Sequence, residues 1–145
     1  MLCVAFYKGN GKFWDRLVRW WTDSQFSHSE LLFSDGYYFS ADAWSNKVRY
    51  TKFQPNPDNW VVVPLPYIDE KMERTIRYWC NGVDGSSYDY VGVALSQVIP
   101  LGIQVGTKWF CSELCTRALQ QVGLLKWYQP WSMHPGKLYN KLTYK

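Results

Sequence analysis

In the segment Trp109-Phe110-Cys111-Ser112-Glu113-Leu114-Cys115, two apolar aromatic residues are followed by a cysteine, and a predicted helix starts directly after it. Ser112 is a favourable N-cap residue, and Glu113 would follow in the first turn, where the helix dipole favours negative charge. Small and apolar residues then recur with helical spacing on one face: Leu114, Cys115, Ala118, Leu119 and Val122. Gly123 supplies a stop signal for this helix.

A cysteine at this position has two interpretations. A thiol at a helix N-terminus lies at the positive end of the dipole, which lowers its pKa and raises its thiolate fraction, as a cysteine nucleophile requires. In the alternative interpretation, Cys111 and Cys115 are two small apolar residues packed in a core. A histidine far earlier in the chain, His28, favours the catalytic interpretation.

The composition predicts a single domain, residues 1–145, with few charges and many aromatic rings. Aromatic residues make up 19% of the chain, and such rings either fill a core or line an apolar, flat cleft. The net charge of +4 is spread along the chain, and no nucleic-acid-binding motif is found. We therefore expect no nucleic-acid partner, and the composition leaves the oligomeric state open.

The chain lacks an apolar run of the roughly 18 residues that a membrane span needs, and its N-terminus lacks the pattern of a secretory signal. We therefore expect a cytoplasmic protein without a transmembrane segment. Its four cysteines are then expected to be reduced: Cys3, Cys80, Cys111 and Cys115. The Cys-x3-Cys spacing is not the usual zinc pattern, so no metal or cofactor is predicted. A zinc site formed by Cys111, Cys115 and a histidine stays an alternative.

Hydrophobic patterning predicts an α+β fold with an antiparallel sheet. The expected strands cover residues 2–7, 26–33, 37–42, 47–53 and 60–65. The expected helices cover residues 12–22, 69–81, 88–98 and 112–122, with a buried loop at 101–106 and a terminal helical turn after His134. Asp35-Gly36 between two β-prone runs is a strong hairpin signal, and Gly82 is expected to close the second helix.

The predicted hairpin carries a group of polar side chains. Because side chains alternate along a strand, His28 and Glu30 share one face of the first strand, and Ser40 and Asp42 share one face of the second. A lone strand histidine is usually a surface residue. Here the neighbouring polar groups favour an imidazole that is held and oriented. A cysteine hydrolase needs such a ring beside a thiolate at a helix start, together with a third polar group that orients the ring.

The chain resembles the circularly permuted NlpC-type papain-like proteins, in particular the YiiX-like branch and related phage proteins. The resemblance lies in five segments: Leu17-Val18-Arg19-Trp20-Trp21-Thr22, Phe26-Ser27-His28-Ser29-Glu30-Leu31, Tyr88-Asp89-Tyr90, Phe110-Cys111-Ser112-Glu113-Leu114 and Pro135-Gly136-Lys137-Leu138-Tyr139. These segments occur in the permuted order and span most of the chain. The resemblance implies a permuted papain-like fold in which an antiparallel sheet packs against a helix that starts with the nucleophilic cysteine.

The resemblance also implies that Cys111 is the nucleophile and His28 the base. The third polar residue of the family lies on the strand after the histidine strand, which corresponds to Ser40 here. A serine departs from the family's usual His, Glu or Asn. Glu30, which stands where the family usually has glycine, is the second candidate for this role, and Asp42 is a third. His134 is an alternative imidazole.

The function implied is that of a cysteine-dependent hydrolase or acyltransferase of amidase or peptidase type. The Cys111 thiolate would attack an acyl carbonyl, with the Cys111 backbone N–H in an oxyanion hole. The partner would be a peptide-, amide- or acyl-bearing substrate. The competing hypothesis is a non-catalytic binding protein on the same fold, possibly a phage protein engaging a host target and acting in the host cytoplasm.

Overall fold

The computed structural model describes residues 1–9, 24–42, 47–86 and 109–144. The helices expected at 12–22 and 88–98 and the loop expected at 101–106 lie outside these residues. So do the resemblance segments Leu17–Thr22 and Tyr88–Tyr90.

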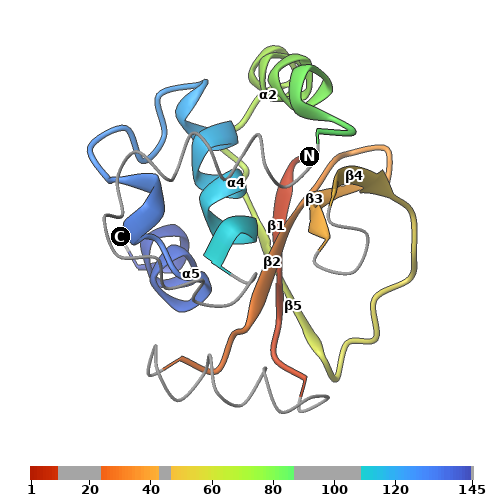
Figure 1. Cartoon of the computed structure of the whole chain (residues 1–145), viewed down its shortest axis with the longest axis vertical. Helices are drawn as coiled ribbons and strands as arrows, with labels where there is room; N and C mark the ends of the chain where they lie inside the picture. The colour runs from red at the N-terminus through yellow and green to blue at the C-terminus, as the bar shows by residue number, and fades with distance from the viewer. Residues whose placement is uncertain (10–23, 43–46, 87–108, 145) are drawn as a thin grey trace.

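The described part of the chain is an α+β structure built on a five-stranded antiparallel sheet, as predicted (Figure 1). The strand order across the sheet is β4-β3-β2-β1-β5, and every neighbouring pair is antiparallel. The strands are β1 (Cys3–Tyr7), β2 (His28–Leu32), β3 (Tyr38–Asp42), β4 (Lys47–Thr51) and β5 (Trp60–Pro64). Strand β1 therefore lies between the histidine strand β2 and the edge strand β5.

The predicted hairpin joins β2 to β3. Gly36 adopts φ +84°, which an L side chain rarely adopts, and its N–H donates to the Phe33 carbonyl at 3.0 Å. Phe33 N–H closes the turn by donating to the Tyr37 carbonyl at 2.9 Å. The Asp-Gly signal is confirmed, and this turn fixes the register of the two strands.

Helix α2 (Glu70–Val83) begins at the Asp69 N-cap, whose carboxylate accepts a hydrogen bond from Met72 N–H at 2.8 Å. The prediction that Gly82 closes this helix is wrong. The helix continues to Val83, and Gly85, with φ +73°, is the glycine that adopts the left-handed conformation after it. Two glycines near a helix end give two possible stops, and the backbone conformation selects the second.

Helix α4 (Trp109–Gln120) begins two residues before Cys111. The prediction that Ser112 is the N-cap is therefore wrong, and Ser112 lies inside the first turns, where its carbonyl accepts the Thr116 hydroxyl at 2.7 Å. An N-cap preference is a local signal that does not by itself set where the preceding backbone turns helical. The predicted stop is confirmed, because Gly123 adopts φ +81° directly after the helix.

The remaining described helices are the short 3₁₀-helix η1 (Pro130–Ser132) and α5 (Pro135–Thr143). The second of these confirms the predicted helical segment after His134. Within the described ranges, no helix is long and apolar enough to cross a membrane.

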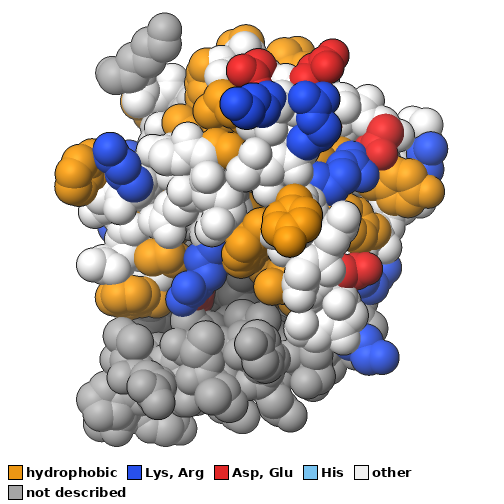
Figure 2. Space-filling model, turned by 90° about the horizontal axis from the view of Figure 1, so that it is seen from above, with side chains coloured by type: hydrophobic (Ala, Val, Ile, Leu, Met, Phe, Trp, Pro, Cys, Tyr) orange, Lys and Arg blue, Asp and Glu red, His pale blue; other side chains and the backbone are white. Residues whose placement is uncertain are grey.

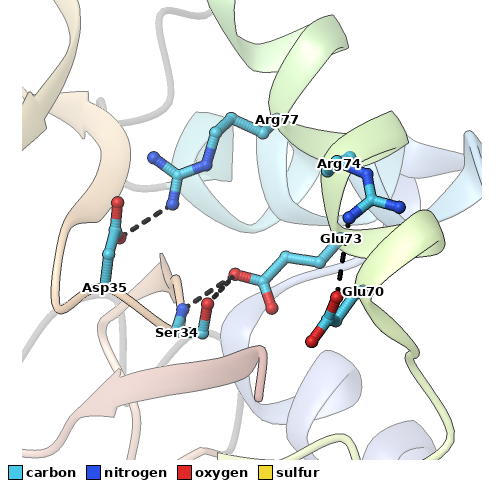
Figure 3. Close-up of a pocket in the computed structure, with 6 residues that line it drawn as sticks. All are labelled: Ser34, Asp35, Glu70, Glu73, Arg74 and Arg77. Atoms are coloured by element: carbon cyan, nitrogen blue, oxygen red, sulfur yellow. Dashed lines mark hydrogen bonds and ion pairs between the residues drawn. The ribbon is translucent and has the colours of Figure 1, made fainter.

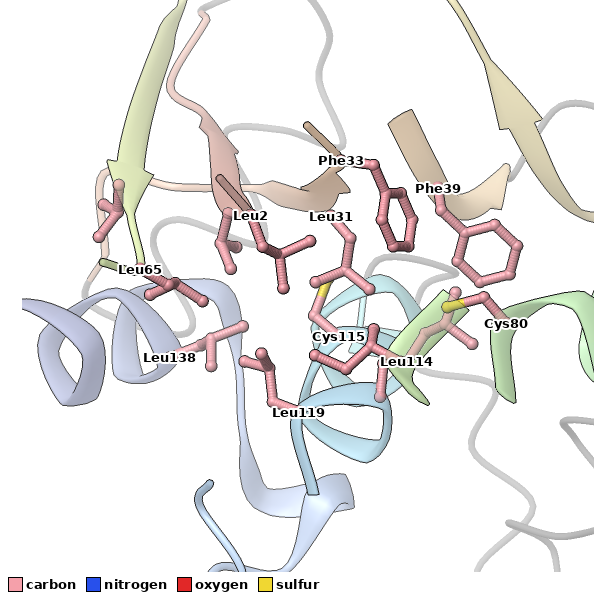
Figure 4. Close-up of a cluster of buried hydrophobic side chains, with 14 of the residues drawn as sticks. Leu2, Leu31, Phe33, Phe39, Leu65, Cys80, Leu114, Cys115, Leu119 and Leu138 are labelled. Atoms are coloured by element: carbon pink, nitrogen blue, oxygen red, sulfur yellow. The ribbon is translucent and has the colours of Figure 1, made fainter. Parts of the chain in front are cut away.

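One face of the sheet packs against α4 and α5 and forms the core (Figure 4). The strand residues on this face alternate along each strand with those of the other face, and they are Val4, Phe6, Leu31, Phe39, Ala41, Val48 and Val63. From α4, Leu114, Cys115 and Leu119 point toward them. Alternation then directs the His28 and Glu30 side chains away from these core residues. His28 is the first residue of β2 and meets Cys111 of α4 beyond the end of the β2–β3 ladder.

Leu119→Ala tests this packing. Leu119 is fully buried between α4 and the sheet, so we expect the free energy of unfolding to fall by about 2–5 kcal/mol, the usual cost of a buried Leu→Ala cavity. Urea denaturation measures the change. Tyr78→Ala on α2 is the control, because Tyr78 is 83% exposed and should change stability by less than about 0.5 kcal/mol. Similar losses in both variants would contradict the packing described.

Candidate active site

Cys111 and His28 are brought together by the packing of α4 on β2. Cys111 has no exposed surface and lies in the first turn of α4, whereas His28 is the first residue of β2. The Cys111 thiol and the His28 ring are hydrogen-bonded. The side chain of His28 is 23% exposed, so the histidine is the more accessible member of the pair.

The Cys111 sulfur also contacts the backbone of β2, at the point where β2 and β3 separate. Both strands are described in full, yet their ladder contains two residue pairs and ends at Leu31 opposite Phe39. Beyond that pair, the N–H of Ser29 donates a hydrogen bond to the Cys111 sulfur. A backbone donor that a continued ladder would have used is thereby directed at the Cys111 sulfur.

The side chain of Ser29 strengthens the same junction. Its hydroxyl is fully buried and donates to the sulfur of Cys115 at 3.8 Å, one helical turn after Cys111. Ser29 therefore contacts both cysteines of α4, one through its backbone and the other through its side chain. These contacts fix how far along β2 the helix lies, and so they fix the distance between the Cys111 thiol and the His28 ring.

Glu30 holds the other side of the His28 ring. Its Oε1 lies 2.9 Å from His28 Nε2, and the Glu30 side chain is 11% exposed. The two side chains meet because residues i and i+2 of a strand share a face. With Nε2 engaged by Glu30, the ring nitrogen available to the Cys111 thiol is Nδ1. The second carboxylate oxygen of Glu30, Oε2, is buried and has no hydrogen-bond partner among the described residues.

These contacts drive the pKa values of the pair in opposite directions. Burial alone would raise the pKa of the Cys111 thiol, but the charge of His28 and its hydrogen bond, with the Ser29 and Ser112 amides, lower it. Burial alone would lower the pKa of His28, but attraction and hydrogen bonding to Cys111 and then to Glu30 raise it well above its ordinary value. The arrangement favours a thiolate beside an imidazolium, which is a nucleophile beside a proton donor.

Among the described residues, no hydrogen bond joins Ser40 to the His28 ring. Ser40 is 6% exposed and lies on β3 opposite Arg49 of β4. Within the described part of the chain, the hydrogen-bond partners of the ring are Cys111 and Glu30. The structure therefore brings Cys111, His28 and Glu30 together and leaves Ser40 aside. The side chain of Asp42 lies outside what the structure describes.

His134, the alternative imidazole, has a structural position. It is the N-cap of α5, where its Nδ1 accepts the N–H of Lys137 at 3.2 Å. Partial burial and then the nearby Lys137 charge lower its pKa. The His134 ring therefore caps the N-terminus of α5.

The other cysteines differ from Cys111 in their chemistry. None of the four cysteines forms a disulfide bond with another described residue. Burial raises the pKa of Cys80 to about 12, and Cys80 lies in the core as predicted. Burial also raises the pKa of Cys3 and of Cys115. Among the described residues, no group of three or more His, Cys, Asp or Glu could hold a metal ion.

Two contributors to the site were missed by the sequence interpretation. The amide of Ser29 has no side-chain signal, because a backbone donor becomes available only where a strand ladder ends. Trp60 on β5 was assigned to a strand, but its ring also lies edge-on to the His28 ring with centroids 6.2 Å apart. Strand alternation alone could not place it there, because it does not give the order of the strands in the sheet, in which β5 pairs with β1 beside β2.

No family model, curated protein or solved structure matches this chain.

A hollow of about 390 Å³ lies between the β2–β3 turn and α2, away from the Cys111–His28 pair (Figure 3). Its charged groups are already paired with one another. Glu73 accepts hydrogen bonds from the Ser34 N–H and hydroxyl at 2.8 and 2.7 Å, and Arg77 binds Asp35 at 2.7 Å. On the face seen in Figure 2, positive and negative side chains likewise lie next to one another. We interpret these hydrogen bonds and ion pairs as the contacts that hold α2 against the hairpin.

Glu30→Gln and Ser40→Ala separate the two candidates for the third group. Glu30→Gln keeps an oxygen but removes the charge, so the pKa of His28 should fall and that of Cys111 should rise. We expect the pH at which Cys111 begins to react with iodoacetamide to increase by about one unit or more. Ser40→Ala should leave that pH unchanged. A larger shift in Ser40→Ala than in Glu30→Gln would reverse the assignment.

Proposed function

We propose that this chain is a cysteine-dependent hydrolase or acyltransferase, of amidase or peptidase type, on a circularly permuted NlpC-type papain-like fold. The observation that supports it best is the Cys111–His28 contact, in which each partner favours the charged form of the other. The order of the parts also agrees with the resemblance, because a histidine strand precedes a cysteine helix that packs on an antiparallel sheet.

The reaction would begin with attack of the Cys111 thiolate on an acyl carbonyl carbon. The S–C bond forms, and the carbonyl electron pair moves to oxygen. His28 in its imidazolium form gives its proton to the leaving nitrogen or oxygen as the bond to the leaving group breaks, which leaves a thioester on Cys111. Water or another acceptor then attacks the thioester, loses a proton to His28 and releases the acyl product, which restores the thiolate and the imidazolium.

The first turn of α4 supports an oxyanion site. The first N–H groups of a helix have no hydrogen-bond partner within the helix. The Ser112 N–H donates a hydrogen bond to the Cys111 sulfur. The Cys111 N–H belongs to the same turn and would donate to the oxygen of the tetrahedral intermediate. The negative charge that develops there also benefits from the positive end of the helix dipole.

Glu30 would be the positioning residue of this site. Its carboxylate fixes the His28 ring through Nε2, holds Nδ1 toward the thiol and stabilises the imidazolium. A carboxylate can stabilise a positive ring, whereas the neutral hydroxyl of Ser40 cannot. In this proposal, the third group that the resemblance implies would come from the histidine strand itself.

We further propose that the protein acts in the cytoplasm, of the host if the chain is viral, on a peptide-, amide- or acyl-bearing substrate. A reducing compartment agrees with a nucleophilic thiol, because an oxidant would consume it. The non-catalytic alternative, a binding protein on the same fold, has the same sheet and helix but needs no reactive thiolate.

Alkylation of each cysteine by iodoacetamide, read by peptide mass spectrometry across pH, separates these alternatives. We expect Cys111 to react at pH values well below the ordinary thiol pKa of about 8.5, because its pKa is lowered. His28→Ala should remove this low-pH reactivity. Cys80 is the internal control and should stay unreactive, because burial raises its pKa to about 12. If Cys111 is no more reactive than Cys80, the enzyme hypothesis fails and the binding hypothesis replaces it.

Once a substrate is found, the proposed ion pair predicts how turnover depends on pH. Activity should fall at low pH as Cys111 is protonated through its lowered pKa, and at high pH as His28 loses its proton through its raised pKa. We expect a bell-shaped kcat/KM profile with its plateau between these two values. A single rise through the ordinary thiol pKa, with no fall at high pH, would contradict the ion pair.

A further inference from the structure

A row of rings crosses three strands on the face of the sheet that carries His28. In the strand register, His28 of β2 is opposite Tyr7 of β1, and Tyr7 is opposite Trp60 of β5. The Tyr7 and Trp60 rings lie 5.2 Å apart, and Trp60 lies 6.2 Å from the His28 ring at an interplanar angle of 77°. Since β2, β1 and β5 lie side by side (Figure 1), the row leads away from the proposed acid–base group.

The row continues onto the segment between β4 and β5. The Phe53 ring lies 5.5 Å from Trp60 and 4.3 Å from Tyr38 of β3. Phe53 is 38% exposed, although its neighbours are aromatic. These rings therefore form a surface beside the site and are not fully enclosed in the core.

In the next row across the same strands, the residues of β1 and β5 are apolar as well. Glu30 of β2 is opposite Ala5 of β1, and Ala5 is opposite Val62 of β5. Val62 is 40% exposed. Neither β1 (Cys3–Tyr7) nor β5 (Trp60–Pro64) carries an Asp, Glu, Lys or Arg, so this side of the site is uncharged along its length.

The other side of the same face has the opposite character. Beyond β3, the strand β4 places the exposed residues Lys47 and Arg49 opposite Asp42 and Ser40. His28 and Glu30 thus lie between an apolar half of the sheet face and a charged half.

Exposure indicates how a substrate approaches. Cys111 has no exposed surface, whereas His28 is 23% exposed, so a substrate reaches the sulfur past the histidine ring. Next to that ring lie Trp60 and then Phe53 and Val62. Exposed apolar side chains at the approach to a reactive group are characteristic of a ligand-binding surface.

We propose that Trp60, Phe53 and Val62 form an apolar specificity subsite, and that the substrate carries an uncharged aromatic or aliphatic group next to its scissile carbonyl. The inference rests on the proposed function, because it names the substrate class of that site. The aromatic faces of Trp60 and Phe53 suit a flat or chain-like apolar group, and the uncharged strands β1 and β5 disfavour a charged one, which would lose hydration without gaining a partner.

Three alkylating reagents with the same reactive group test the subsite without a known substrate. They are iodoacetamide, N-benzyl-iodoacetamide and N-(4-carboxybenzyl)-iodoacetamide, which differ in size, apolar area and charge. The second-order rate constants at Cys111 are measured by peptide mass spectrometry in the full chain. We expect the benzyl reagent to react at least about tenfold faster than iodoacetamide, and the carboxybenzyl reagent to lose that advantage.

Variants locate the effect. Trp60→Ala and Phe53→Ala should each bring the ratio of the benzyl rate constant to the iodoacetamide rate constant close to one. Because Trp60→Ala could also destabilise the sheet, Val62→Glu is the second variant. Val62 is on the edge strand and 40% exposed, so a charge is tolerated there, and it should abolish the benzyl preference. Tyr78→Ala, which removes an aromatic ring on α2 that is 83% exposed, is the matched control and should change nothing.

The outcomes separate the two proposals. If Cys111 shows its low-pH reactivity with iodoacetamide but no benzyl preference, or a preference that survives Trp60→Ala, Phe53→Ala and Val62→Glu, the subsite is wrong and the proposed function stands. If Cys111 reacts with none of the reagents below the ordinary thiol pKa, the proposed function fails and the subsite fails with it.

Discussion

The contact between the Cys111 thiol and the His28 ring is the interaction on which the candidate site depends. It joins the first turn of α4 to the first residue of β2, so it exists only when the helix is packed on the sheet. In a buried setting either charge alone would be unfavourable, because desolvation penalises an unpaired thiolate or imidazolium. Together, and with Glu30 behind the ring, each charge supports the other. The fold and the proposed chemistry are therefore held by the same packing.

The early end of the β2–β3 ladder explains how the thiol is accommodated. A continuous ladder would occupy the Ser29 N–H, but the ladder ends at Leu31 opposite Phe39, and the amide binds the Cys111 sulfur instead. The Ser29 hydroxyl then reaches Cys115, one turn further along α4. The same strand thus presents Ser29 to the helix on one face and His28 with Glu30 on the other. Local irregularity of this kind is common where sheets carry functional groups.

Much of the fold was predictable from the sequence because its signals are local. The Asp35-Gly36 turn, strand alternation and helical periodicity predicted the hairpin, the shared face of His28 and Glu30, and the core face of α4. The start of α4 and the stop of α2 were misplaced, since capping preferences do not fix backbone dihedrals. The choice between Ser40 and Glu30 could not be predicted, because it depends on which way the imidazole turns once α4 is packed. The role of the Ser29 amide required the tertiary structure.

Thiolate absorbance in the ultraviolet tests the ion pair most directly. The pKa values of Cys3, Cys80 and Cys115 are all raised, so any thiolate present in the acid-to-neutral range belongs to Cys111. The wild type and Cys111→Ser are titrated from about pH 3 to about pH 10, and the difference is recorded. Our account predicts one thiolate that forms well below about pH 8.5 in the wild type and is missing in Cys111→Ser. No thiolate below that value in either protein would contradict it.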